Sequence, residues 1–146
     1  MSTEENCAVV RRAFDSMSAG PEAFLAEHDE IYSADLVGHF AGMPPLDISM
    51  HRQFGLGTFS AFPDIKRPVE DLVAAGDKVV ARWTSFGTHS GEFMGVPATG
   101  RFLRTSGITI FRLEDGKIVE EWSESDMLGM LQQVGAIPGA GAAAEA

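Results

Sequence analysis

The stretch from Asp115 to Gly135, DGKIVEEWSESDMLGMLQQVG, contains three structural signals in succession. Asp115-Gly116 predicts a tight hairpin turn, because glycine accepts the positive φ angle that such a turn requires. The β-branched and aromatic residues that follow predict a strand over 117–124. This strand runs directly into Asp126 and an apolar segment, which predicts a short helix over 127–134. The last part of the chain is therefore expected to be a strand that ends at an acid and continues into a helix.

Three further strands are predicted upstream of this segment. Strands are predicted over 65–74, 78–89 and 101–113, and the second of these is rich in Val, Trp, Thr and Phe, which is typical of strands. Gly76-Asp77 predicts a turn between the first two, and residues 91–100 predict a long turn that includes apolar side chains. With the final strand, these segments predict a meander of long antiparallel strands.

Helical periodicity dominates the N-terminal third. Apolar residues at i, i+3, i+4 and i+7 predict a helix over 4–18, and a second helix is expected from Pro21 towards His28. Residues 31–40 then predict an extended segment, and Ser49 is expected to cap a third helix. Helices followed by a meander predict an α+β fold, in which a curved antiparallel sheet wraps around the N-terminal helices and leaves a cone-shaped cavity.

Composition narrows the class of protein. The 146 residues suit a single domain over 1–137, followed by a Gly/Ala-rich tail over 138–146 that we expect to be disordered. A net charge of −10 disfavours nucleic acid as a partner. Cys7 has no second cysteine to pair with, and no apolar run reaches the roughly 20 residues that span a bilayer. A cytoplasmic protein without membrane contact is expected.

The order and spacing of several motifs resemble those of the SnoaL-like polyketide cyclases, a family of the NTF2-like superfamily. The resemblance covers residues 8–135, and besides 115–135 it is carried by Gly38-His39, Phe62-Pro63-Asp64, Gly76 to Trp83, Gly87 to Gly91 and Thr99-Gly100-Arg101. It implies a cone around an apolar pocket, no cofactor, and an intramolecular aldol closure that uses one late aspartate as acid and base. Asp126 matches that aspartate. Glu121 departs from the pattern, because relatives often have histidine there.

Asp126 also has a physical case of its own. An aldol closure removes a proton from carbon and delivers one to a developing alkoxide, and a carboxylate in an apolar pocket suits both tasks near neutral pH. Met127, Leu128 and Met130 are expected to supply these apolar surroundings. The alternative is that Asp126 caps the following helix, since it stands immediately before the apolar run.

The four histidines form two pairs that differ in their sequence context. His39 and His89 each lie beside glycine in an extended segment and match histidine positions of the family, so they are candidates for polarising a substrate carbonyl. A structural role is the alternative for both. His28 and His51 are expected on helix surfaces. No pair of histidines has the i, i+4 spacing of a metal site, so no metal is predicted.

The remaining candidates are predicted to line the pocket. Trp83 and Trp122 would stack on a flat ligand, although either could be plain core. The other predicted pocket residues are Tyr32, Phe59, Met94 and Met127. Arg82 and Arg104 are expected to point outward from their strands and to pair with acids such as Glu120 or Glu124.

These features together predict a cofactor-free cyclase that acts on a hydrophobic, polyketide-like small molecule. The alternatives are another enzyme on the same fold, an isomerase or an epoxide hydrolase, and a protein that binds a small molecule without chemistry. A homodimer or higher homo-oligomer is expected, because Ile108, Ile110 or Phe111 would leave apolar surface on the outer face of the sheet.

Overall fold

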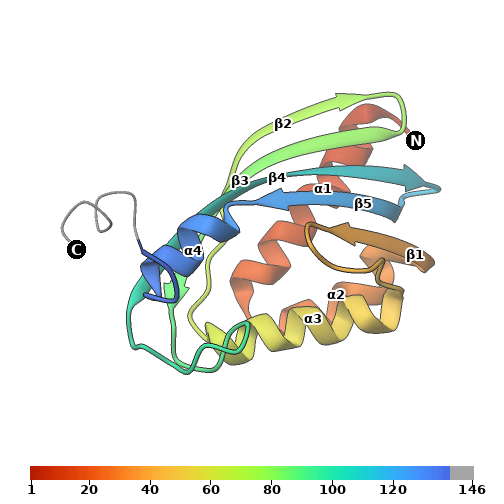
Figure 1. The fold of residues 1–146 in the computed structure, drawn as a ribbon. Helices are drawn as coiled ribbons and strands as arrows, with labels where there is room; N and C mark the ends of the chain where they lie inside the picture. Colours follow the sequence, from red (N-terminus) through yellow and green to blue (C-terminus); the bar gives the residue numbers. More distant parts are fainter. Residues whose placement is uncertain (139–146) are drawn as a thin grey trace.

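One curved sheet forms the frame of the molecule, and the computed structural model describes residues 1–138 (Figure 1). Its strand order is β1-β5-β4-β3-β2. The strands are β1 (Tyr32–Phe40), β2 (Val69–Ala75), β3 (Lys78–Thr88), β4 (Phe102–Glu114) and β5 (Lys117–Ser125). The helices are α1 (Thr3–Ala19), α2 (Pro21–Ile31), α3 (Ile48–Ala61) and α4 (Met127–Gln133). The predicted tail lies almost wholly outside the described residues.

The predicted meander is confirmed, and one strand pairing differs from the prediction. Strands β2 to β5 pair antiparallel in chain order, and Asp115 and Gly116 both have positive φ in the turn between β4 and β5. Strand β1, however, pairs parallel with β5, with His39 opposite Trp122. The sheet is therefore mixed rather than wholly antiparallel. No tight turn joins β1 to β5, so the local turn signals did not indicate this pairing.

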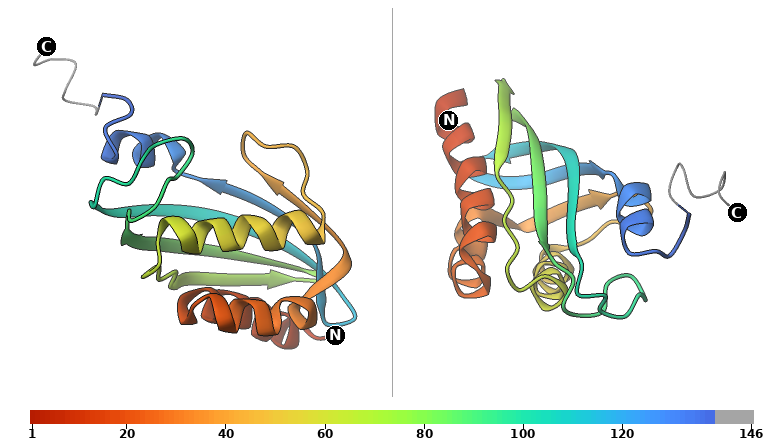
Figure 2. Two further views of the ribbon diagram at one scale, coloured as in Figure 1. Left: turned by 90° about the horizontal axis from the view of Figure 1, so that it is seen from below. Right: turned by 90° about the vertical axis from the view of Figure 1, so that its left-hand side faces the viewer.

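Helices α1, α2 and α3 all lie on the concave side of the sheet (Figure 2). Ser2 caps α1 through its hydroxyl, which accepts a hydrogen bond of 3.1 Å from the Glu5 N–H. The cap of α3 corrects the sequence prediction: Asp47, not Ser49, precedes the helix, and its Oδ1 accepts a 2.8 Å hydrogen bond from the Met50 N–H. An N-cap must stand before the first helical residue, and α3 begins at Ile48.

The apolar core divides into two clusters under the sheet. One contains Val10 and Phe14 of α1 against Val79 and Phe111, and the other joins α2, α3 and α4 near Phe24. Phe111 is thus buried, which corrects the expectation that it lies on the outer face. Side chains alternate along β4, so Ile108 and Ile110 are exposed outside while Thr109 and Phe111 face inward. No helix within residues 1–138 is long and apolar enough to cross a membrane.

Candidate active site

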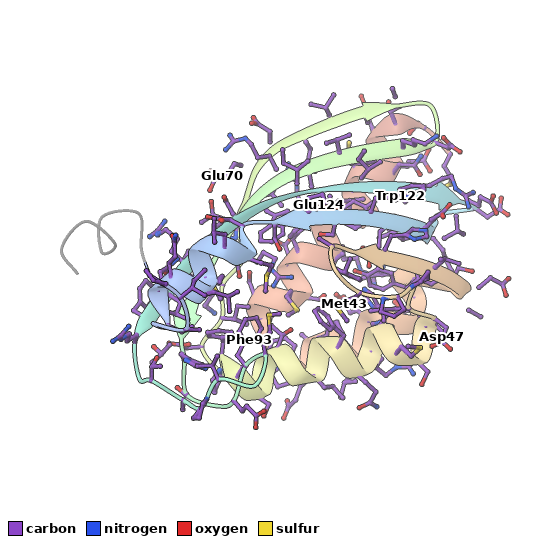
Figure 3. The ribbon with its side chains drawn as sticks, in the orientation of Figure 1. Met43, Asp47, Glu70, Phe93, Trp122 and Glu124 are labelled. Atoms are coloured by element: carbon purple, nitrogen blue, oxygen red, sulfur yellow. The ribbon has the colours of Figure 1, made fainter. Side chains whose placement is uncertain are left out.

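Two connected voids lie between α3 and the concave face of the sheet. The first, of about 120 Å³, extends towards α4 and the loop before β4, and Phe93 of that loop is labelled in Figure 3. The second, of about 80 Å³, extends towards α1 and α2. Both are lined by six common residues: Phe40, Phe54, Thr58, Arg67, Trp83 and Ser123. We therefore treat them as two chambers of one cavity.

The first chamber is largely apolar, as the sequence predicted for the pocket. Its walls include Phe62, Phe86 and Phe93, and free space including the open mouth amounts to about 690 Å³. An enclosed space of about 150 Å³ is enough for a benzene-sized molecule. The enclosed part of this chamber therefore suits about one ring of a ligand, and a larger ligand would extend into the mouth.

The second chamber contains a buried chain of titratable groups, Glu121, His51 and His28. Their exposed fractions are 3%, 8% and 1%. His51 Nε2 lies 2.7 Å from Glu121 Oε1, and His51 Nδ1 lies 2.8 Å from His28 Nε2. Strand β5 supplies the acid, the first turn of α3 supplies His51, and the last turn of α2 supplies His28. Three separate elements thus converge on one polar cluster at the apolar cavity.

The two oxygens of Glu121 have different surroundings. Oε1 is buried 2.7 Å from His51 Nε2, and it accepts no hydrogen bond of good geometry among residues 1–138. Oε2 also makes no hydrogen bond within these residues, and it is not buried as Oε1 is. Glu121 therefore presents a carboxylate oxygen that is free to accept a proton from a molecule in the chamber.

His28 remains neutral under ordinary conditions. Burial, followed by the neighbouring His51, lowers the pKa of His28 from 6.5 to about 4. A neutral imidazole carries one ring proton, so the His28–His51 contact has a donor on one side and an acceptor on the other. His28 therefore acts as a neutral hydrogen-bonding partner of His51.

The expectation that His28 and His51 lie on helix surfaces is wrong. His28 follows Phe24 by four residues and precedes Ile31 by three, and all three side chains are buried on one face of α2. That spacing was visible in the sequence and could have identified His28 as an inward-facing residue. His51 has a weaker signal, because it lies four residues before Gly55, where α3 comes close to the Phe24 ring.

Arg67 is a functional candidate that the sequence interpretation did not single out. It lines both chambers, its guanidinium lies 4.9 Å from the Trp83 ring centroid, and its Nε donates a long, 3.4 Å hydrogen bond to Ser85 Oγ. Burial lowers its pKa, whereas the nearby Tyr32 and Glu121 oppose that shift. Arg67 precedes Pro68 and lies just outside β2, so no strand pattern marked its side chain as inward-facing.

Two of the predicted pocket residues line the cavity. Trp83 lines both chambers and donates a 3.0 Å hydrogen bond to Thr109 Oγ1, and Met127 lines the first chamber. Phe59 does not line it, because it is buried in the core beside Phe24. Met94 is 60% exposed in the loop before β4. Tyr32 packs on the two buried histidines, 4.9 Å from His28 and 4.5 Å from His51 between ring centroids.

Asp126 is the N-cap of α4. Its Oδ1 accepts a 2.8 Å hydrogen bond from the Gly129 N–H, and the residue is exposed. Ser125 and Met127 line the first chamber, but Asp126 does not. The apolar surroundings expected for this carboxylate are therefore not found, and its position agrees with the capping alternative. Its participation in proton transfer stays a prediction.

His39 and Trp122 lie together on the face of the sheet opposite the cavity. Their rings stack at 5.6 Å, and His39 Nε2 contacts Glu120 Oε2 at 2.8 Å. Figure 3 labels Trp122 on this part of β5. Adjacent residues of a strand point to opposite faces, so Trp122 faces outward because Glu121 faces inward. The predicted stacking of Trp122 on a pocket ligand is not supported by this position.

His89 fixes the two ends of the loop before β4. Its Nδ1 contacts Thr99 Oγ1 at 3.0 Å and accepts a 3.3 Å hydrogen bond from the Thr99 N–H, and its side chain is fully buried. It does not line the cavity. These contacts agree with the structural alternative for His89.

The outward orientation of Arg82 and Arg104 is confirmed, with different partners from those expected. Arg82 pairs with Asp71 at 2.6 Å on the neighbouring strand, and exposed Arg104 lies over the Phe86 ring at 5.3 Å. As for metals, residues 1–138 contain no group of three or more His, Cys, Asp or Glu side chains placed to hold an ion.

Comparisons with known proteins agree with this architecture. A family model described as SnoaL-like polyketide cyclase matches residues 8–134. Two curated relatives are described as aklanonic acid methyl ester cyclases: DnrD of Streptomyces peucetius and DauD of Streptomyces sp. (strain C5). Each is 38% identical to this chain over 60 residues, which is 41% of this chain. The matched segment is 41% of the length of DnrD and 37% of the length of DauD. The match thus spans about two fifths of the length of these curated relatives.

Solved structures match over most of the chain. A SnoaL-like protein from Jannaschia sp. CCS1 has a TM-score of 0.86 at 26% identity, covering 93% of this chain and 95% of that one. IdmH from Streptomyces antibioticus has a TM-score of 0.77 at 33% identity, and the match covers 89% of this chain and 98% of IdmH. The sheet and the helices beneath it therefore follow an arrangement seen in related proteins.

Proposed function

Because the chain belongs to the SnoaL-like polyketide cyclase family, we propose that it cyclises a hydrophobic, polyketide-like molecule by acid–base chemistry in the cavity under α3. The observation that carries the proposal is the buried carboxylate of Glu121, which borders the cavity and has one oxygen that is neither buried nor hydrogen-bonded within residues 1–138. The reaction needs no cofactor.

The proposed chemistry is an intramolecular aldol closure. Glu121 takes a proton from a carbon next to a substrate carbonyl, which leaves an enolate. The enolate carbon forms a bond to a second carbonyl carbon of the same molecule, and the electron pair of that carbonyl moves to its oxygen. The protonated Glu121 then returns the proton to this alkoxide, so substrate and product are isomers. His51 Nε2 contacts the other Glu121 oxygen at 2.7 Å, and the neutral His28 contacts His51 on its far side.

Asp126 is the second candidate for the proton-transfer group. It matches the aspartate of the family pattern and stands between two residues that line the first chamber. Its carboxylate is exposed and already accepts the Gly129 N–H. We therefore assign proton transfer to Glu121 and the capping of α4 to Asp126, and substitution of each residue distinguishes the two assignments.

The relatives suggest the class of substrate to test first. DnrD and DauD are described as cyclases of aklanonic acid methyl ester, and an aromatic ring of such a molecule suits the Phe-lined first chamber. The experiment is to incubate the protein with aklanonic acid methyl ester and to analyse the products by mass spectrometry and chromatography. A new product of unchanged mass that contains a new ring carbon–carbon bond by nuclear magnetic resonance supports cyclisation, whereas an isomerase would give unchanged mass without that bond.

The alternative functions give different results in the same experiment. An epoxide hydrolase would yield a product heavier by one water molecule from an epoxide substrate. A binding protein would raise its own melting temperature with the compound and return it unchanged. Lack of both turnover and binding, across a panel of aromatic polyketides, would contradict the proposal.

We further propose that two copies associate through the outer face of the sheet. Ile108 and Ile110 are exposed there on adjacent outward positions of β4, and such apolar surface is often covered by a partner. Light scattering after size-exclusion chromatography measures the oligomeric state of the protein. A dimer that becomes a monomer in Ile110→Lys supports the proposal, and a wild-type monomer contradicts it.

A further inference from the structure

The cavity contains a cation that the acid–base chemistry does not use. Arg67 lines both chambers, and no carboxylate oxygen within residues 1–138 lies within 4.0 Å of it to form an ion pair. Arg52 and Arg112 are also partly buried, and each pairs with an acid. Arg11, Arg101 and Arg104 form no ion pair within residues 1–138 either, but they are exposed to solvent. Among the partly buried arginines of the described residues, Arg67 is thus the one without a partner of opposite charge.

A partly buried guanidinium lowers the stability of the folded protein unless an opposite charge or hydrogen-bond acceptors compensate for its lost hydration. Arginine stays protonated in proteins, and removing an ion from water carries a penalty that an opposite charge normally offsets. Arg67 has five N–H donors, of which only Nε has a partner, at 3.4 Å. Its terminal nitrogens make no hydrogen bond in residues 1–138, and they are not sealed from the cavity. They are available to a molecule that enters.

The contacts of Arg67 also fix its orientation. The guanidinium lies over the Trp83 ring at 4.9 Å, and Trp83 is itself held by its hydrogen bond to Thr109. A guanidinium held over an aromatic ring keeps its N–H edge free, and that edge matches two oxygens in one plane. Both a carboxylate and the enolate of a β-dicarbonyl present such a pair of oxygens.

We propose that Arg67 binds a planar, anionic pair of oxygens on the substrate. This inference rests on the proposed function and adds the class of substrate: an aromatic molecule with a carboxylate or an enolisable β-dicarbonyl group. Arg67 and Glu121 both border the second chamber. When the oxygens of a β-dicarbonyl group lie at Arg67, the negative charge that develops on them as Glu121 removes the carbon-bound proton faces a fixed cation, which stabilises it.

Calorimetric titration of small aromatic probes tests the inference without any turnover. Naphthoate carries the carboxylate, benzoylacetone above its own pKa carries the enolate, and naphthamide is the neutral isostere of naphthoate. The variants are Arg67→Gln, which removes the charge, and Arg67→Lys, which keeps the charge but not the planar fork. Arg82→Gln is the matched control, because Arg82 is an exposed arginine paired with Asp71.

We expect the wild type and Arg82→Gln to bind one of the anions at least about tenfold more tightly than naphthamide. Arg67→Gln should lose that preference while its affinity for naphthamide stays within about threefold, and Arg67→Lys should be intermediate. Preference for naphthoate or for benzoylacetone identifies which oxygen pair is recognised. A preference that survives in Arg67→Gln, or equal binding of anions and naphthamide by the wild type, overturns the inference but leaves the proposed function in place. Failure of every probe to bind contradicts both.

Discussion

The stability of the protein should fall on mild acidification because of one buried histidine. In the unfolded chain His28 takes up a proton near pH 6.5, whereas in the folded chain its pKa is about 4. Between these values the unfolded state binds more protons, so the free energy of unfolding decreases as the pH is lowered through this window. Well above pH 6.5 the imidazole is neutral in both states and contributes no pH dependence.

The size of this effect follows from the two pKa values. A difference of about 2.5 units at roughly 1.4 kcal/mol per unit gives a loss of about 3 kcal/mol between pH 6.5 and 4. For a domain of this length that corresponds to a fall in melting temperature on the order of 5–10 °C. The exposed fraction of His28 is only 1%, so solvent screening does not reduce the effect much.

The assay is thermal unfolding at several pH values, for the wild type and for His28→Gln. The carboxylates are common to both proteins, so the two proteins are compared by the slope of melting temperature against pH. We expect a smaller slope in the variant, because it lacks the imidazole of His28. Nuclear magnetic resonance of the imidazole protons gives the pKa directly, and titration of His28 near pH 6.5 would refute the reasoning.

Three further predictions concern packing and capping. In Gly107→Ala the new Cβ would lie 2.2 Å from Trp83 Cζ2, so we expect a loss of about 1–3 kcal/mol in urea unfolding, and an unchanged midpoint would show that Trp83 moves freely. Asp126→Asn should change stability by less than about 0.5 kcal/mol and Asp126→Ala should cost about 1 kcal/mol, since asparagine also caps helices; equal losses would argue against the cap. His89→Ala should lower the melting temperature and leave the naphthamide affinity of the folded protein unchanged, whereas a stable variant with altered affinity would indicate a role in the cavity.

Local patterns predicted most of the fold. The Asp115-Gly116 turn, the strands on either side of it and the helices up to Ile31 depend on neighbouring residues, and these predictions are confirmed. The parallel pairing of β1 with β5 joins segments about 80 residues apart, with His39 opposite Trp122. No neighbouring residue specifies such a pairing, so it could not be predicted from turns or periodicity.

The candidate site was harder to predict, for a reason that β5 illustrates. Of the adjacent residues Glu121 and Trp122, only one can face the cavity, and the larger apolar side chain was assigned to it. The structure places Glu121 inside because His51 and His28 provide polar contacts there. Those contacts come from two helices. The spacing of Phe24, His28 and Ile31 indicates an inward-facing His28, but no local pattern shows that His51 of another helix and Glu121 of a strand meet it.

The central claim is that Glu121 transfers the proton, and the rate of cyclisation by Glu121→Gln tests it most directly. Glutamine keeps the size of the side chain and removes the group that accepts and returns a proton. With the substrate identified as above, we predict a loss of at least about 100-fold in rate, with the melting temperature and the affinity for naphthamide retained. Asp126→Asn, measured in parallel, should stay close to the wild-type rate. A nearly normal rate in Glu121→Gln, together with loss of activity in Asp126→Asn, would contradict the account and return proton transfer to Asp126.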